Sequence, residues 1–181
     1  PTVGIIRGEL DEYNPTLLHA RSCRMDLRFV DRSSYKLKEN SDVAISIIAE
    51  YNDPLILPEG GNNELARKGT SEVAIEINVQ QPTVNYIALS AGTGGTASGI
   101  ISKKGSHQKV LVFSALKGDF LKDEIIDMSR SSDFELQTDY HFGGYARTKP
   151  ELISFINQFY NDHHIVLDQI YNGKGMFGIL T

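Results

Sequence analysis

The feature that most constrains the fold of this chain is a glycine-threonine turn, Gly92–Thr96, set between a buried strand and a helix. The residues before it, 84–91, are nearly continuously apolar, as in a parallel strand that is covered on both faces. A helix over 97–104 and a second apolar strand over 109–115 follow the turn. This succession predicts a right-handed βαβ unit with parallel strands.

The chemistry of the turn indicates a phosphate site. Open α/β sheets bind ligands at the carboxyl ends of their parallel strands, where this turn lies. Its glycines let the backbone approach a ligand, and the free N–H groups at the start of a helix favour a phosphate dianion. Thr93 and Thr96 add hydroxyl groups. Because neither a P-loop nor a Gly-x-Gly-x-x-Gly fingerprint is present, we expect a small phosphorylated cofactor or substrate.

The rest of the chain alternates between short apolar runs and amphipathic stretches. We expect strands at 3–6, 27–30, 54–58 and 165–167, and helices from Asn14-Pro15 to about 25, over 35–51, over 70–80, over 120–130, after a capping box at 148–151, and after 171–175. This alternation predicts the α/β class, with a mostly parallel sheet and helices on both of its faces. The loop near Asn52-Asp53-Pro54 is the expected seam between two domains.

Composition and charge argue against several classes of protein. The net charge of −5 argues against a nucleic-acid partner, whose binder would carry a basic face. No apolar run approaches the roughly 18 residues of a membrane-spanning helix, so no membrane partner is expected. The single cysteine, Cys23, fits a reducing cytoplasm, and its helical surroundings predict a small buried side chain rather than a nucleophile. The histidines show no metal-ligand spacing, so no metal site is predicted.

The turn Gly92–Thr96 resembles the phosphate loop of pyridoxal-phosphate enzymes with the tryptophan synthase β-like, or type II, fold. Four further stretches narrow the resemblance to the 1-aminocyclopropane-1-carboxylate deaminase and D-cysteine desulfhydrase family: Gly4–Glu9, Ile56–Gly61, Gly143–Ala146 and Leu167–Lys174. The resemblance runs in collinear order along the chain. It implies pyridoxal 5'-phosphate as cofactor, a small amino acid as substrate and a homodimer. It also implies that residues 1–53 are part of a small domain and residues 54–181 most of a large cofactor-binding domain.

The resemblance assigns roles to individual residues. Tyr171 aligns with a family tyrosine that lies against the pyridoxal ring and handles the substrate, so it is the expected catalytic residue. Asn172 takes the position that faces the pyridine nitrogen, where the deaminases usually carry glutamate and the desulfhydrases an uncharged residue. Asparagine can hydrogen-bond this nitrogen but supplies no charge. The cofactor is therefore expected to bind at Gly92, Thr93, Gly94, Gly95, Thr96 and Asn172.

The lysine that bonds the cofactor in this family has no counterpart in the chain. None of its lysines lies in the family's lysine motif, and Lys174, which follows the tyrosine, is interpreted as structural. We therefore expect a fragment that lacks the N-terminal lysine segment and the C-terminal end, and that is inactive by itself. Asp168 is expected either to support the cofactor pocket or to cap a strand, and Glu59–Asn62 to form a loop beside the same site.

Three functions follow from this interpretation. The first is a pyridoxal-phosphate-dependent deaminase of the 1-aminocyclopropane-1-carboxylate type, which gives a 2-oxo acid and ammonia. The second is a D-cysteine desulfhydrase that gives pyruvate, sulfide and ammonia, and the uncharged Asn172 favours it. The third, from another class, is a non-catalytic module that binds phosphate or pyridoxal phosphate. The absent fingerprint argues against a Rossmann-type dinucleotide protein.

Overall fold

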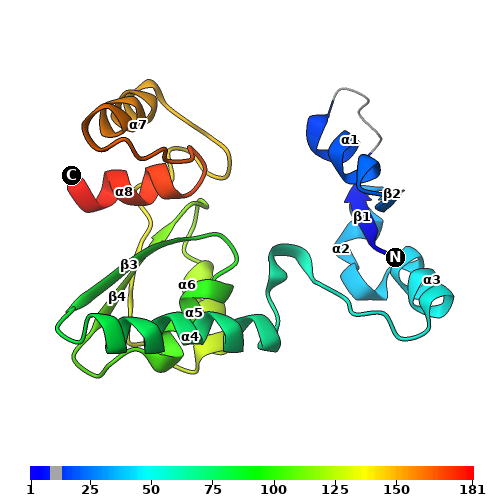
Figure 1. The fold of residues 1–181 in the computed structure, drawn as a ribbon, viewed down its shortest axis with the longest axis horizontal. Helices are drawn as coiled ribbons and strands as arrows, with labels where there is room; N and C mark the ends of the chain where they lie inside the picture. The colour runs from blue at the N-terminus through cyan, green and yellow to red at the C-terminus, as the bar shows by residue number, and fades with distance from the viewer. Residues whose placement is uncertain (9–13) are drawn as a thin grey trace. The chain divides into compact units, whose positions relative to one another are not determined.

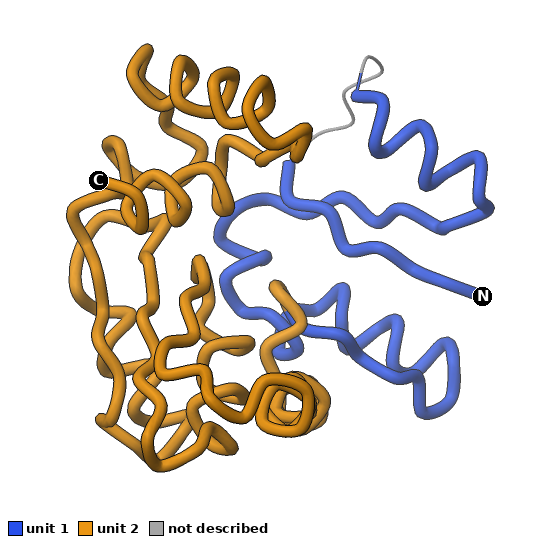
Figure 2. Tube along the Cα trace, turned by 60° about the vertical axis from the view of Figure 1, so that its left-hand side comes forward, with its two compact units in different colours: residues 1–58 blue, residues 59–181 orange. Residues whose placement is uncertain are grey.

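The computed structural model of the chain describes residues 1–8 and 14–181, which divide into two compact units (Figures 1 and 2). Unit 1 comprises Pro1–Pro58 and unit 2 comprises Glu59–Thr181. Of the family-like stretch Gly4–Glu9, the last residue, Glu9, lies outside the described residues. The assignment of the two parts of the chain to a small domain and a cofactor domain stays a prediction.

Unit 1 is built on a parallel pair of strands, β1 (Val3–Arg7) and β2 (Asp26–Val30). The helix α1 (Pro15–Ser22) precedes β2 and begins as its sequence predicts. The side chain of Asn14 accepts hydrogen bonds from the N–H groups of Thr16 and Leu17, at 3.0 and 3.1 Å, and proline occupies the first helical position. A small core of Val30, Ala44 and Ile47 is buried in this unit.

The helix that the sequence predicts over 35–51 is wrong, because two caps divide the segment. The structure has α2 (Arg32–Lys36), a short 3₁₀ turn (Lys38–Asn40) and α3 (Asp42–Tyr51). Asp31 caps α2, and the Ser41 hydroxyl oxygen accepts a hydrogen bond from the Ala44 N–H at 3.2 Å, which starts α3 anew.

Unit 2 contains the predicted βαβ unit, extended by one strand. Its sheet has the order β3 (Tyr86–Ala91), β4 (Lys109–Ser114), β5 (Glu135–Gln137), and both pairings are parallel. The helices α5 (Gly95–Lys103) and α6 (Leu121–Ser129) make the two crossovers. Ala91 pairs with Ser114, so β3 and β4 end at the same level. The prediction of parallel strands is confirmed, whereas β5 was missed.

Helices cover both faces of this sheet, as predicted (Figure 1). Alternate residues of β3, including Ile87 and Ala91, face a core that they share with α5 and with α4 (Glu64–Gln80). Ser90 points to the opposite face, where α8 (Asn172–Leu180) lies. The helix α7 (Pro150–His163) packs against α8. The helices α4 and α5 therefore pack on one face of the sheet, and α8 packs on the other.

Several local expectations fail. The helix α4 begins before the predicted residue 70, because the Asn63 side chain accepts a hydrogen bond from Ala66 N–H at 2.8 Å. The predicted capping box is wrong, since Lys149 occupies the cap position and its side chain makes no capping hydrogen bond. The predicted strands at 54–58 and 165–167 are also wrong, because neither segment pairs with a strand among the described residues. Their apolar side chains are largely exposed, for example Leu55 and Val166.

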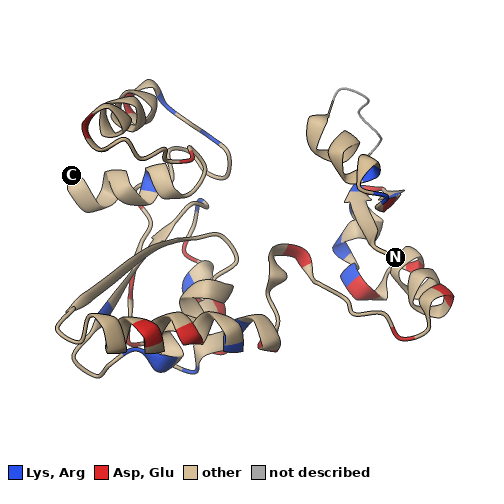
Figure 3. Ribbon diagram, in the orientation of Figure 1, with Lys and Arg blue, Asp and Glu red and all other residues tan. Residues whose placement is uncertain are grey.

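The described residues can be compared with the predictions about charge, the cysteine, membrane spans and metal sites. The helix α4 carries both acidic and basic residues, interspersed along its length (Figure 3). Cys23 is exposed, so the prediction that it is buried is wrong. Within residues 1–8 and 14–181, no helix combines the length and the hydrophobicity that a membrane crossing requires. Nor does any cluster of three His, Cys, Asp or Glu side chains in these ranges have a geometry suited to a metal ion.

Candidate functional site

The predicted phosphate turn, Gly92–Thr96, connects β3 directly to α5. Gly94 occupies the cap position of α5 with a φ of 76°, in the left-handed region. A methyl group at this position would lie 2.7 Å from a side-chain carbon of Ile125. Both the backbone conformation and the close packing therefore require glycine at position 94.

The N-terminus of α5 is open to a ligand. No side chain among the described residues caps it. The first hydrogen bond of the helix runs from the Ser98 N–H to the Gly94 carbonyl, at 2.8 Å. The N–H groups before Ser98 have no partner within the helix. Thr93 and Thr96 are exposed, so their hydroxyls are free to reach a bound group. This arrangement suits a phosphate or another small anion.

The loop 59–62 lies against the phosphate turn, as the sequence predicts. The Asn62 side-chain amide donates a hydrogen bond to the carbonyl of Thr93 at 3.3 Å. Gly60 has a φ of 70°, and a methyl group there would lie 2.9 Å from the Thr93 side chain. The two loops therefore support each other through Thr93.

Tyr171 lies beside the phosphate turn although it is far away in the sequence. A methyl group placed on Gly92 would lie 3.0 Å from the Tyr171 hydroxyl oxygen and 3.1 Å from a ring carbon. The Ser90 hydroxyl donates a hydrogen bond to the Tyr171 carbonyl at 2.9 Å, which ties the start of α8 to β3. The structure therefore brings together the two motifs on which the sequence-based prediction depends. The catalytic role of Tyr171 stays a prediction.

Asp168 fixes the backbone that carries Tyr171. Its carboxylate accepts hydrogen bonds from the N–H groups of Ile170, Tyr171 and Asn172, at 2.9, 2.7 and 2.9 Å. Partial burial by itself would raise the pKa of Asp168, but these backbone donors lower it below the usual value. No strand among the described residues ends at Asp168, so the expected strand cap is not formed. Its carboxylate instead holds the backbone of residues 170–172, and its support of a cofactor pocket stays a prediction.

A second tyrosine accompanies Tyr171. The ring centroid of Tyr145 lies 6.1 Å from that of Tyr171, with the two planes inclined at 59°. Burial raises the pKa of Tyr171, and the neighbouring Tyr145 and Asp168 raise it further. Tyr171 therefore carries its proton at neutral pH and can donate it. The sequence marks the stretch Gly143–Ala146 only as family-like, so it gives no signal that Tyr145 lies here.

Asn172 and Lys174 follow Tyr171 but face different surroundings. Asn172 is exposed at the first position of α8, and its proposed role opposite a pyridine nitrogen stays a prediction. Lys174 is buried, and its ammonium group donates hydrogen bonds to two backbone carbonyls. The interpretation of Lys174 as a structural residue is therefore confirmed.

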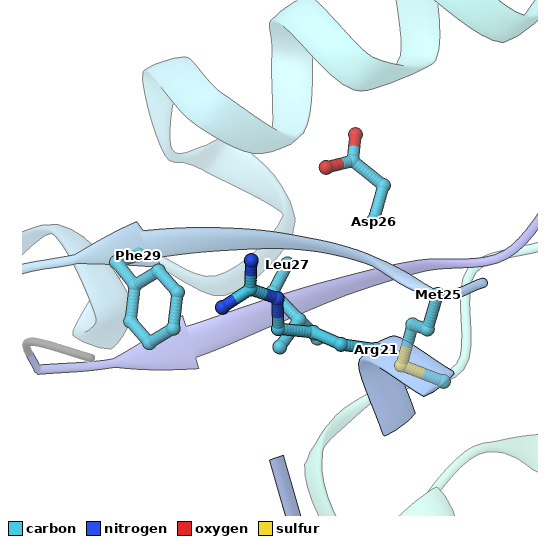
Figure 4. Close-up of a pocket in the computed structure, with 5 residues that line it drawn as sticks. All are labelled: Arg21, Met25, Asp26, Leu27 and Phe29. Carbon is cyan, nitrogen blue, oxygen red and sulfur yellow. The ribbon is translucent and has the colours of Figure 1, made fainter. Parts of the chain in front are cut away.

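A hollow in unit 1 contains none of the predicted site residues (Figure 4). It has a volume of about 280 Å³ and is lined by Arg21, Met25, Asp26, Leu27 and Phe29. The carboxylate of Asp26 is already paired with Arg28, at 2.7 Å. The predicted chemistry therefore lies in unit 2.

Comparison with known proteins supports the resemblance seen in the sequence. No family model matches the chain. A mitochondrial bifunctional D-cysteine desulfhydrase/1-aminocyclopropane-1-carboxylate deaminase of Arabidopsis thaliana is 28% identical over 152 residues, which cover 73% of this chain and 37% of that protein. A D-cysteine desulfhydrase of Klebsiella pneumoniae is 24% identical over 156 residues, which cover 77% of this chain and 48% of that protein. The chain thus spans half or less of the length of these two relatives.

Solved structures confirm the fold. The crystal structure of an ACC deaminase homologue matches 97% of this chain and 59% of its own, with a TM-score of 0.81 and 20% identity. Threonine deaminase isoform 2 of Solanum lycopersicum, in its processed form, matches 97% of this chain and 53% of its own, with a TM-score of 0.54 and 14% identity. The predicted α/β fold with parallel sheets is the fold of these proteins.

Proposed function

Because the chain is a relative of the 1-aminocyclopropane-1-carboxylate deaminase and D-cysteine desulfhydrase family and has its tryptophan synthase β-like fold, we propose that it is part of a pyridoxal-phosphate-dependent enzyme. The complete protein would convert a small amino acid, 1-aminocyclopropane-1-carboxylate in the first instance, into a 2-oxo acid and ammonia. The relatives' names support the reaction class, and the geometry of unit 2 supports the cofactor.

The observation that carries this proposal is the meeting of the phosphate turn and Tyr171. An uncapped helix N-terminus with two exposed threonine hydroxyls fits a phosphate group. The Tyr171 ring approaches Gly92, at the edge of this turn, so an aromatic ring lies next to the proposed phosphate site. A ligand that carries both a phosphate and a flat ring, as pyridoxal phosphate does, matches this arrangement.

Each residue of the site would make a distinct contribution. When bound, pyridoxal phosphate supplies an electron sink for bonds at the substrate α-carbon. The phosphate turn would hold the phosphate through its N–H groups and through Thr93 and Thr96. Tyr171, which keeps its proton, would deliver a proton close to the substrate. Asn172 would hydrogen-bond the ring nitrogen without adding charge. Lys174 is buried against carbonyls, so we propose that the cofactor-bonding lysine lies outside this chain, which is inactive alone.

One observation favours a second substrate. The uncharged Asn172 matches the desulfhydrases better than the deaminases, and the two named relatives both include D-cysteine desulfhydrase activity in their names. Release of ammonia and of sulfide by the complete protein, measured with 1-aminocyclopropane-1-carboxylate and with D-cysteine, separates the two substrates. Binding of the cofactor without turnover of either substrate would instead indicate a non-catalytic binding module.

The cofactor proposal is tested by binding of pyridoxal 5'-phosphate and its competition by inorganic phosphate. Replacing Thr93 and Thr96 together by valine removes two hydroxyl donors to a dianion, so affinity is expected to fall about tenfold or more. Thr148 is also exposed but lies outside the turn Gly92–Thr96, so Thr148→Val serves as the matched control and should bind like wild type. Equal affinity of the double variant and wild type would refute the assignment of the phosphate to this turn.

The homodimer and the cytoplasmic location belong to the same proposal. The resemblance to the family supports the homodimer, and the single cysteine, Cys23, fits a reducing compartment such as the cytoplasm. Light scattering of the complete protein tests the first, and a monomer at micromolar concentration would contradict it.

A further inference from the structure

Lys174 is the largest side chain that is fully buried among the described residues, with 1% of its surface exposed. Its ammonium group donates hydrogen bonds to the carbonyls of His141, at 3.0 Å, and of Gly144, at 2.9 Å. Burial lowers the pKa of Lys174, and Asp168 opposes this effect. A buried ammonium is costly unless its protons are bonded, so Lys174 and these carbonyls depend on each other.

The two carbonyls belong to a loop, 141–147, whose backbone is strained. Phe142 and Ala146 both have a φ of 54°, which is uncommon outside glycine, and Gly144 has a φ of 119°. Such conformations persist only where the surrounding structure holds them. The loop's own backbone bonds, Gly144 N–H to His141 carbonyl and Arg147 N–H to Gly144 carbonyl, are internal to it.

Two contacts join this loop to α8. One is the pair of bonds from Lys174, and the other is the edge-to-face packing of Phe142 on Phe177, with centroids 5.1 Å apart. Both contacts come from α8, the helix that starts immediately after Tyr171. The residue that follows Gly144 is Tyr145, whose ring lies beside Tyr171. The bonds from Lys174 therefore end one residue away from the second tyrosine of the site.

We propose that Lys174 is a positioning residue that holds Tyr145 against Tyr171 by fixing the loop 141–147 to the first turn of α8. This inference rests on the proposed function only in treating Tyr171 as a site residue. The hydrogen bonds of the Lys174 ammonium go to the loop 141–147 and not to the phosphate turn. It sets the surroundings of the Tyr171 hydroxyl through Tyr145.

The test compares two lysines that are both bonded to a backbone carbonyl. Lys174→Met keeps an unbranched side chain of nearly the same length and removes its donors. Lys104→Met is the control, because the Lys104 ammonium also donates to a backbone carbonyl, that of Gln108 at 2.8 Å, beyond the far end of α5. Lys104 is in addition paired with the Asp133 carboxylate. Nuclear Overhauser effects between ring protons of Tyr145 and Tyr171, assigned in the full chain with single Tyr→Phe variants, report their proximity. They should be lost in Lys174→Met and retained in Lys104→Met.

A second variant reaches the loop without touching the lysine. Gly144→Ala is strained by the φ of 119°, although a methyl group there would have room, with its nearest neighbour 3.7 Å away. It should also weaken the ring contacts. Wild-type ring contacts in either folded variant would overturn the proposal, because a lysine that only contributes stability would leave the pair of rings in place.

The functional readout is a split between turnover and cofactor binding in the complete protein. Lys174→Met should lower kcat at least about tenfold, because a misplaced group near the reacting atoms slows the reaction strongly. Its affinity for pyridoxal phosphate should change less than about twofold, because the phosphate turn is untouched. A wild-type kcat in this variant would contradict the inference. If wild type fails to bind pyridoxal phosphate, the proposed function fails, whereas the ring contacts still decide the role of Lys174.

Discussion

Two glycines, Gly99 of α5 and Gly69 of α4, allow the same substitution to be made with opposite expected effects. A methyl group on Gly99 would lie 2.0 Å from the Thr70 hydroxyl oxygen, 2.7 Å from the Arg67 carbonyl oxygen and 3.0 Å from the Ser71 backbone nitrogen. A methyl group on Gly69 would meet nothing within 4 Å. We therefore predict that Gly99→Ala destabilises the protein and that Gly69→Ala stabilises it.

The magnitudes follow from these distances. The Thr70 hydroxyl can rotate away from Gly99→Ala, but the Arg67 carbonyl belongs to the backbone of α4. An ordinary contact begins at 3.4 Å, so α4 must shift by a good part of an ångström. Overpacking of this kind costs about 1–3 kcal/mol, and the better helix propensity of alanine offsets up to about 1 kcal/mol. Gly69→Ala receives only the propensity gain, about 0.5–1 kcal/mol.

Urea unfolding followed by far-UV circular dichroism measures both free energies. Tyrosine fluorescence offers a second probe, because the chain has eight tyrosines and no tryptophan. The free energy of unfolding should differ by about 2 kcal/mol between the two variants, with wild type between them. If Gly99→Ala were as stable as Gly69→Ala, the close approach of α4 and α5 would be refuted.

Two further substitutions examine the segment that carries Tyr171. Asp168→Asn replaces the oxygen that accepts the Asn172 N–H by a donor, so we expect a loss of about 1 kcal/mol of unfolding free energy at pH 7. The pKa of Asp168 is lower in the folded state than in the unfolded state, where it is near 3.9. The Asp168 carboxylate therefore contributes its full share of the unfolding free energy above the unfolded-state pKa, and this share disappears as the pH falls through the folded-state pKa. Wild type and Asp168→Asn should therefore converge in urea titrations as the pH is lowered from 7 to 3, and a constant difference would contradict this role. Gly175→Ala would place a methyl group 2.2 Å from the Ser90 hydroxyl oxygen and break the bond from Ser90 to the Tyr171 carbonyl, which should cost about 1–2 kcal/mol. Adding Ser90→Ala removes the clashing atom and should recover part of this loss in the same assay, whereas a purely additive double variant would show that the clash is elsewhere.

The local parts of the fold could be predicted from the sequence. The phosphate turn was found because a buried strand, a glycine-rich turn and a helix follow each other without interruption, and all three signals are local. The cap of α1 was found for the same reason. The three-residue strand β5 has no apolar run of its own and exists only because β4 offers an edge. The segment 54–58 is apolar but pairs with no strand of the part of the chain that the structure describes, so its composition misled the prediction.

The site itself was predicted only in part. The resemblance named Tyr171, but no local signal shows that Tyr145 lies beside it, since the two are brought together by a loop with unfavourable backbone angles. The sequence interprets Lys174 correctly as a structural residue. It cannot show which groups the ammonium binds, because the two carbonyls are brought to it by the tertiary fold.

The position of Tyr171 relative to the phosphate turn is fixed within unit 2 alone. Its N–H is held by the Asp168 carboxylate, its carbonyl by the Ser90 hydroxyl, and its ring faces Tyr145. Ser90 stands two residues before Gly92, so the strand that delivers the phosphate turn also anchors the tyrosine. A displacement of the end of β3 would therefore move both features together rather than separate them. We conclude that β3 and α8 set the spacing between the turn Gly92–Thr96 and Tyr171, which the proposed ring-and-phosphate ligand would have to match.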